Sequence, residues 1–190
     1  MTEALRRAEM VAVGSALSRR GLIGGREGNL SCRLEDGVIL VTPRGAYKGR
    51  MSGSDMVRCA PFQPPPPGAS SEAKAHLEVY RRCPEVRALI HAHPPAVLAL
   101  SALGRVPSPD ILLEGKALVP RIELVPAITA GSSELADACG RAIQLAPAAI
   151  LLEHGALCAG EDLWQALDRV EVLELLASID LAGAGSVVPI

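Results

Sequence analysis

Aromatic side chains are scarce in this chain, at 2% of its 190 residues. They are Tyr47, Phe62, Tyr80 and Trp164, too few to build the stacking surfaces that bind single-stranded nucleic acids. An excess of basic residues is also missing, because 19 Lys and Arg stand against 21 Asp and Glu, with a formal net charge of −2. We therefore expect no surface that attracts a polyanion, and no nucleic acid as a partner.

Paired cysteines and long apolar segments are missing as well. The five cysteines are an odd number and none forms a Cys-x-x-Cys pair, so neither a disulfide framework nor a thiolate zinc site is expected. No uncharged apolar run reaches the roughly 18 residues of a membrane span. Charges at Glu3, Arg6 and Arg7 interrupt any apolar leader. We expect a cytoplasmic protein with free thiols and no membrane partner.

The chain does have enough aliphatic residues for one core. Apolar residues make up 49% of it, which suits a globular fold. A chain of 190 residues corresponds to one domain, which we expect over residues 1–182, followed by a short C-terminal tail over 183–190.

Periodicity predicts both helices and strands in that domain. Helices are expected over residues 3–20, from Ser70 or Ser71 to Pro84, from Pro94 to Gly104, over 132–145 and over 163–181. Strands are expected over residues 30–34, 38–42, 56–59, 86–91, 121–125 and 148–153, and the turn signal Asp36-Gly37 joins the first two as a hairpin. Strands that alternate with helices indicate a single α/β layered domain.

Three of the four histidines fall at the ends of predicted buried strands. His91 and His93 are two residues apart, so both imidazoles point to one face of a strand. His154 follows another apolar strand. Three imidazoles at strand ends can bind zinc and leave a fourth coordination position for substrate. A single histidine more often has a structural role, but the shared placement of these three favours a metal site.

Three shorter motifs are ambiguous by themselves. Ser70-Ser71-Glu72 begins a predicted helix, where hydroxyls and free N–H groups can bind an anion and the carboxylate can act as a general base. A plain capping segment explains it equally well. Gly28-Asn29 and Thr42-Pro43-Arg44-Gly45 are most simply turns.

Together, these motifs resemble the class II aldolase/adducin family, and within it the fuculose-phosphate aldolases. The segments Gly28–Ser31, Thr42–Gly45, Ser70–Glu72, His91–His93 and His154-Gly155 follow the family's order, and the likeness covers residues 5–180. The resemblance implies a mixed, mainly antiparallel central sheet flanked by helices. It also implies a homotetramer with active sites at subunit interfaces.

The resemblance also implies functional residues. Glu72 would be the catalytic acid/base. One zinc ion per subunit would be bound by His91, His93 and His154. The substrate phosphate would be held by Gly28, Asn29, Arg44, Gly45, Ser70 and Ser71, although Arg44 stands where the family carries a small hydroxyl residue.

The reaction implied by the resemblance is cleavage of a carbon–carbon bond. A zinc-dependent aldolase would cleave a small phosphorylated ketose to dihydroxyacetone phosphate and an aldehyde, through an enediolate that the metal stabilises. Glutamate at position 72 favours this chemistry over the family's epimerases, which carry aspartate there. Two alternatives stay open: a decarboxylase or dehydratase acting on a sugar-acid or ketose phosphate, and a non-catalytic binding module similar to adducin.

The aldehyde side of the site departs from the family pattern. The fuculose-phosphate aldolases use a tyrosine from a neighbouring subunit, near position 112, as the proton donor to the aldehyde oxygen. This chain has Leu112 there and no tyrosine after Tyr80. Glu114 or Lys116 would have to supply the proton, or the natural substrate is a different one.

Overall fold

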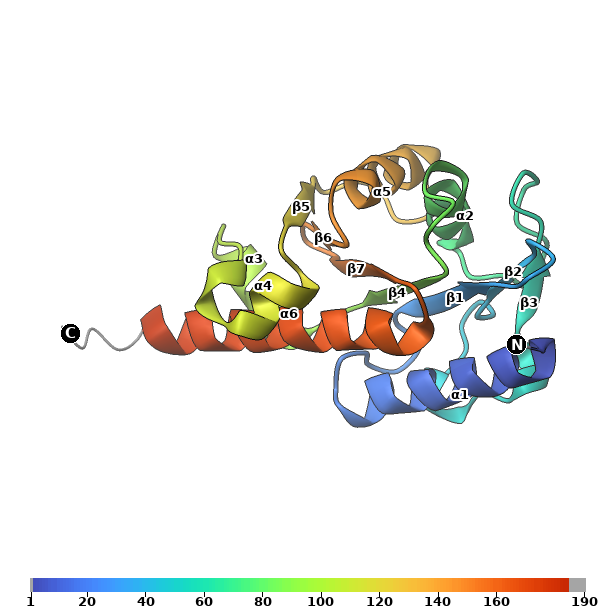
Figure 1. Ribbon diagram of the computed structural model, residues 1–190, viewed down its shortest axis with the longest axis horizontal. Coiled ribbons are helices and arrows are strands. Elements are labelled where there is room, and N and C mark those ends of the chain that lie inside the picture. The colour runs from blue at the N-terminus through green and yellow to red at the C-terminus, as the bar shows by residue number, and fades with distance from the viewer. Residues whose placement is uncertain (1, 185–190) are drawn as a thin grey trace.

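A seven-stranded sheet separates two layers of helices in the computed structural model, which describes residues 2–184 (Figure 1). The helices are α1 (Glu3–Arg19), α2 (Ala73–Arg82), α3 (Pro95–Ala102), α4 (Leu113–Leu118), α5 (Ser133–Leu145) and α6 (Leu163–Ala184). The strands are β1 (Asn29–Arg33), β2 (Ile39–Val41), β3 (Val57–Cys59), β4 (Ala88–Ala92), β5 (Ile122–Val125), β6 (Ala148–Leu151) and β7 (Gly155–Gly160). Short 3₁₀ turns lie at Lys48–Arg50, Gly53–Asp55 and Pro109–Ile111.

The sheet is mixed and mainly antiparallel, as predicted. Its strand order is β3-β2-β1-β4-β7-β6-β5. Only the pair β5–β6 is parallel, and the remaining pairs are antiparallel. The predicted hairpin joins β1 to β2, with Gly37 at a φ of 84° and Asp36 accepting a hydrogen bond from the Val38 amide.

Two aliphatic cores lie on the two faces of this sheet. Figure 1 shows α1 and α6 on one face and α2 and α5 on the other. Because side chains alternate along a strand, Leu89 of β4 packs in the core under α2 and α5, and Ile90 packs in the core under α1 and α6. A central strand that is buried on both faces explains the continuous apolar run at this point of the sequence.

The structure differs from the predicted elements in two places that concern the histidines and Glu72. Helix α2 begins at Ala73 with Glu72 as its N-cap residue, so Ser70 and Ser71 precede the helix and do not cap it. The Ser70 hydroxyl instead accepts a hydrogen bond from the Glu72 amide, at 3.3 Å, which forms a local turn. Strand β6 ends at Leu151, because the chain turns back at residues 152–154 into β7, a strand that the sequence analysis missed.

The last helix is longer than predicted. It runs to Ala184, past the expected domain boundary at 182. The rest of the predicted tail, residues 185–190, lies outside the described residues. Among the helices of residues 2–184, none combines the length and the apolar character needed to cross a bilayer.

Candidate active site

Three imidazoles meet at one end of the central strands of the sheet. His91 is the fourth residue of β4, His93 follows that strand, and His154 lies in the turn between β6 and β7. The antiparallel pairing of Ala92 with Ala156 brings that turn beside the end of β4. Ligand atoms of the three rings lie within 4.8 Å of one another. The predicted convergence of His91, His93 and His154 is therefore found in the structure.

The chemistry of this cluster fits a divalent metal ion. His91 donates from Nδ1 to the carbonyl oxygen of Ala156, at 3.0 Å, so its Nε2 keeps a free lone pair. That Nε2 lies 2.9 Å from Nε2 of His93. Burial lowers the pKa of His93 and lowers that of His91 well below the usual value. Both rings are therefore neutral near pH 7, as a metal ligand must be, and an all-imidazole donor set suits zinc.

Glu72 faces the same centre. Its Oε2 lies 3.3 Å from Nε2 of His91, and its Oε1 lies 3.3 Å from Nε2 of His154. Asn29 donates from Nδ2 to Oε2 of Glu72, at 2.8 Å, and its position opposite His91 in the β1–β4 pair makes this contact possible. The carboxylate is thus fixed in one orientation beside the three imidazoles.

Two glycines allow these segments to approach one another. At Gly28, where φ is 66°, a Cβ atom would lie 2.7 Å from the His91 carbonyl oxygen. At Gly155, a Cβ atom would lie 2.4 Å from the Ala92 carbonyl oxygen. Any larger residue at either position would push its loop away from the end of β4, so these glycines bring Asn29 and His154 close to His91.

A cavity of about 240 Å³ opens in front of the carboxylate and the imidazoles. Its lining includes five of the six residues predicted to hold phosphate, together with Glu72 and two of the histidines. These lining residues are Gly28, Asn29, Gly45, Ser70, Ser71, Glu72, His93 and His154. Anion-binding groups and a metal-binding cluster therefore share one small pocket.

A profile of the family described as "Class II Aldolase and Adducin N-terminal domain" matches residues 8–181. The chain belongs to the class II aldolase/adducin family. A 3-oxo-tetronate 4-phosphate decarboxylase of Pectobacterium atrosepticum is 31% identical to it, over 91% of this chain and 82% of that protein. A methylthioribulose-1-phosphate dehydratase of Acidiphilium cryptum is 30% identical, over 93% of this chain and 90% of that protein.

Solved structures agree with this membership. The crystal structure of an L-fuculose-1-phosphate aldolase from Thermus thermophilus matches with a TM-score of 0.88 and 32% identity, over 97% of both chains. The relatives thus include an aldolase, a dehydratase and a decarboxylase of phosphorylated compounds. Membership establishes the fold, while the reaction must be argued from the site.

Arg44 stands apart from the rest of the predicted phosphate residues of this class II aldolase/adducin family member. Its side chain is exposed, and the cavity is lined by its neighbours Pro43 and Gly45 but not by Arg44 itself. A role of Arg44 in phosphate binding stays a prediction.

Lys48 is the lining residue that the sequence analysis passed over. It is 3% exposed, and burial lowers its pKa to about 8. No local pattern distinguishes it from any surface lysine, because its contacts are with segments distant in sequence: Nζ bonds to the carbonyl oxygen of Arg26, and its 3₁₀ turn packs against α1. Its closeness to the Thr42–Gly45 motif was the one available signal.

His76 lies behind Glu72 and outside the metal cluster. It is 1% exposed, and its Nδ1 lies 2.6 Å from the Ser31 hydroxyl, which in turn contacts the Tyr80 hydroxyl at 2.9 Å. Burial lowers its pKa to about 3, so the ring is neutral. These contacts are those of a structural histidine on the buried face of α2.

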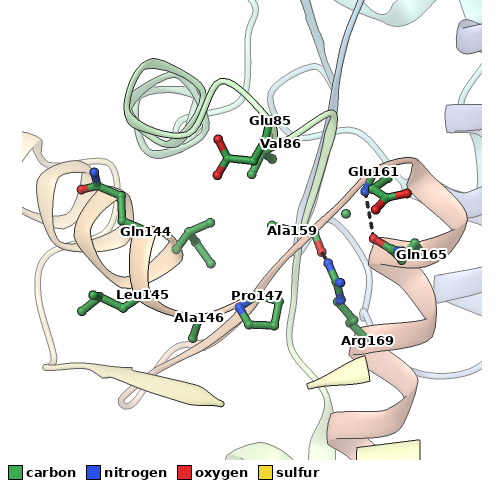
Figure 2. A pocket seen from close by; sticks show the side chains of 12 residues that line it. Glu85, Val86, Gln144, Leu145, Ala146, Pro147, Ala159, Glu161, Gln165 and Arg169 are labelled. Atoms are coloured by element: carbon green, nitrogen blue, oxygen red, sulfur yellow. Dashed lines mark hydrogen bonds between the residues drawn. The ribbon is translucent and has the colours of Figure 1, made fainter. Parts of the chain in front are cut away.

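A larger hollow, of about 340 Å³, lies at the opposite ends of β4 and β7. Figure 2 shows Arg169 reaching the Ala159 carbonyl there and Gln165 beside Glu161. The guanidinium of Arg169 is already engaged with the carbonyl oxygens of Leu118 and Ala159, and no histidine lines this hollow. We therefore place the active site at the smaller cavity.

Proposed function

We propose that the chain is a metal-dependent aldolase that cleaves a small phosphorylated ketose to dihydroxyacetone phosphate and an aldehyde. The observation that carries this proposal is the position of Glu72, whose carboxylate lies 3.3 Å from the imidazoles of His91 and His154 and lines the same cavity as Ser70 and Ser71. An acid/base group, a metal-binding cluster and an anion-binding segment are the parts that such a reaction needs.

The cofactor we propose is zinc, one ion per subunit, held by His91, His93 and His154. When bound, it would supply Lewis-acid stabilisation of the negative charge that develops on substrate oxygen atoms. The chain's own residues then move the proton and orient the substrate.

Glu72 carries the proton transfer. When the carbon–carbon bond of the substrate breaks, the electron pair of that bond stays on the ketone fragment, which becomes an enediolate. In cleavage, a base at the aldehyde side takes the proton of the hydroxyl group that becomes the aldehyde oxygen, and the Glu72 carboxyl group delivers a proton to the enediolate carbon. Both transfers run the other way in the reverse reaction. Asn29, which donates to Oε2 at 2.8 Å, keeps the carboxylate in position through both steps.

Ser70, Ser71, Gly45 and the Gly28-Asn29 segment would bind the phosphate. The two serines lie directly before α2, where the helix dipole and the serine hydroxyl donors favour an anion. The cavity, at about 240 Å³, is smaller than the roughly 300–1,000 Å³ of sites for drug-sized ligands. That size supports a substrate of a few carbon atoms.

A second candidate is decarboxylation of a 3-oxo acid phosphate, and the lack of any tyrosine after Tyr80 favours it. Decarboxylation leaves the same kind of enediolate but releases CO₂, so it needs no group that takes a proton from the aldehyde-side hydroxyl in cleavage or returns it in the reverse reaction. The named activity of the Pectobacterium relative is of this kind.

An assay of the metal-loaded protein on both substrate types tests the proposal. Fuculose 1-phosphate and other ketose phosphates are followed by the dihydroxyacetone phosphate formed, and 3-oxo-tetronate 4-phosphate is followed by the CO₂ released. Cleavage of a ketose phosphate that a chelator abolishes supports the aldolase. Release of CO₂ without aldol cleavage assigns the second candidate, and a fully metal-loaded protein that turns over neither type contradicts both.

We further propose a cytoplasmic homotetramer with active sites at subunit interfaces. A neighbouring subunit could then provide the acid that the described residues of one chain do not place in the cavity. We also propose that residues 1–182 form the class II aldolase/adducin-like domain.

A further inference from the structure

Lys48 is the buried cation of the cavity. Its Nζ donates to the carbonyl oxygen of Arg26 at 2.7 Å and to that of Ala46 at 3.0 Å. These carbonyls belong to the two loops that lead to Gly28 and follow Gly45, so the ammonium ties together both sides of the proposed phosphate site. An ammonium group has three N–H donors, and two are used by these bonds. The third is left for a ligand in the cavity that Lys48 lines.

The charges around the cavity show why a buried cation is needed. Arg26 and Glu27 are exposed at its mouth, and the Arg26 guanidinium lies 5.0 Å from the centre of the Tyr47 ring. Lys48 and Glu72 are the buried charged residues of the lining. A phosphomonoester carries close to two negative charges, and it would enter a pocket that already holds the Glu72 carboxylate. Hydroxyl and amide donors offset such charge less well than a charge-assisted hydrogen bond does.

We propose that Lys48 anchors the phosphate of the substrate, its ammonium donating to a phosphate oxygen while its two carbonyl bonds hold the loops that form the cradle. The proposal rests on the proposed function for the identity of the substrate, but not for the binding of the anion. It gives this chain a phosphate contact from a residue that lines the cavity, which Arg44 does not.

One plainer role must be distinguished from this one. Lys48 could serve only as a pin between the two loops. A pin depends on its donors, whereas an anchor depends on its positive charge. Lys48→Gln separates these two roles, because the amide still offers two N–H donors but carries no charge.

Calorimetric titration with inorganic phosphate measures the anchor directly. Metal-loaded wild type, Lys48→Gln and Lys74→Gln are compared at pH 7, with metal content and melting temperature recorded for each. Lys74 is the matched control, since it is exposed on α2. We expect Lys48→Gln to raise the Kd for phosphate by about 10- to 100-fold, the usual effect of one hydrogen bond to a charged group. Metal content should not change, and Lys74→Gln should bind phosphate like the wild type.

The pH dependence gives a second measurement. Burial lowers the pKa of Lys48 to about 8, so wild-type affinity for phosphate should fall between roughly pH 7.5 and 9 as the ammonium loses its proton. The other titratable groups around the cavity are those of Arg26, Glu27, Glu72, His91, His93 and His154. Their contributions persist in Lys48→Gln, so the difference between the two curves belongs to Lys48.

An unchanged Kd for phosphate in a folded Lys48→Gln protein would overturn the proposal and leave Lys48 a pin between loops. If that variant does not fold, a wild-type affinity that stays constant over the same pH range overturns it instead. The readout is binding of inorganic phosphate, so a positive result stands even if no ketose phosphate is cleaved. Conversely, an active enzyme with unaltered phosphate binding in Lys48→Gln refutes the role of Lys48 alone.

Discussion

The position of the Glu72 carboxylate allows two roles, that of a metal ligand and that of an acid/base. Its oxygens lie 3.3 Å from the nitrogens of His91 and His154, a position from which a carboxylate can also ligate the metal. The hydrogen bond from Asn29 to Oε2 holds the group whether or not it does so. The distinction between ligand and acid/base can be drawn with a variant of the same shape.

Glu72→Gln keeps the size of the side chain but cannot exchange a proton. We expect it to retain its metal and its binding of phosphate, while turnover falls by ~10²–10⁴-fold, the usual contribution of a positioned acid or base. Exchange of the enediolate-forming proton of a bound ketone with solvent deuterium should fall equally. Near-normal turnover would move the acid/base role elsewhere, and loss of metal would make Glu72 mainly a ligand.

His93 tests the metal site. Two imidazoles rarely hold zinc well, so His93→Ala should lose most of its bound metal, as measured by elemental analysis after dialysis. His76→Asn, which changes a buried histidine outside the cluster, is the matched control and should keep its metal. Full occupancy in His93→Ala would rule out this ligand set.

His76 should make the fold sensitive to acid. Its pKa is lowered from 6.5 to about 3, mainly by burial, so below pH 6.5 the unfolded state binds a proton that the folded state does not. Stability therefore falls as the pH drops through this window, by about 1 kcal/mol per pH unit. Urea unfolding of wild type and His76→Asn between roughly pH 6.5 and 4.5 should give a shallower loss in the variant. Parallel curves would place the acid sensitivity in other groups.

At the scale of elements, the turn between β6 and β7 carries His154 in a strained backbone. Glu153 has a φ of 61°, the one positive φ among the described non-glycine residues. This left-handed conformation costs a residue with a Cβ atom about 1 kcal/mol, although asparagine tolerates it. Because the side chain of Glu153 is exposed, the effect of a substitution there on stability depends mainly on the backbone conformation.

We expect Glu153→Asn to raise the free energy of unfolding by up to about 1 kcal/mol without affecting metal affinity. Glu153→Val should lower it by a similar amount and weaken metal binding, because a β-branched residue would displace the turn and His154 with it. Urea unfolding and zinc titration measure both effects. Glu161→Val is the control, since Glu161 is also exposed and its φ is not positive. Equal effects at the two positions would show that strain at Glu153 is negligible.

The elements that could be predicted from the sequence are those with local signals. The helix from Ser133 to Leu145 has a serine cap and an apolar face, and the structure places Ser132 as its N-cap. Strand β7 has no such signal, because the sequence Gly-Ala-Leu-Cys-Ala-Gly contains residues that rarely favour strands. It is a strand because β4 and β6 pair with it on both sides. The burial of Lys48 was not predicted for the same reason, because it arises from tertiary packing.

At the scale of the whole molecule, the site is assembled from segments that are far apart in sequence. Asn29, Glu72, His91 and His154 meet because β1, β4 and β7 are neighbours in the sheet and α2 covers the same face. The strand-end rule predicted which histidines converge, but it could not supply the strand order. The family resemblance supplied the remaining site residues.

The proposed tetramer requires an apolar surface on which a second copy of the chain can dock. The exposed apolar side chains on and near α6 include Leu103, Leu113, Leu175 and Ile179, at 65%, 80%, 47% and 37% exposure. Leu175 and Ile179 are one helical turn apart, so they share one face of α6. Apolar patches of this kind are typical of interfaces, which agrees with the proposed tetramer.

Charging this face should separate assembly from metal binding. We expect the wild type to run as a tetramer in light-scattering chromatography, and Leu175→Glu with Ile179→Glu to give smaller, folded species, because burying two carboxylates in an apolar contact is unfavourable. All three histidines come from one chain, so these species should keep their metal. Their aldolase turnover should fall if a neighbour supplies the missing proton donor. Leu5→Glu, at an exposed position on α1, should leave the tetramer intact. A fully active wild-type monomer would contradict the interface and require the proton donor to lie within the chain itself.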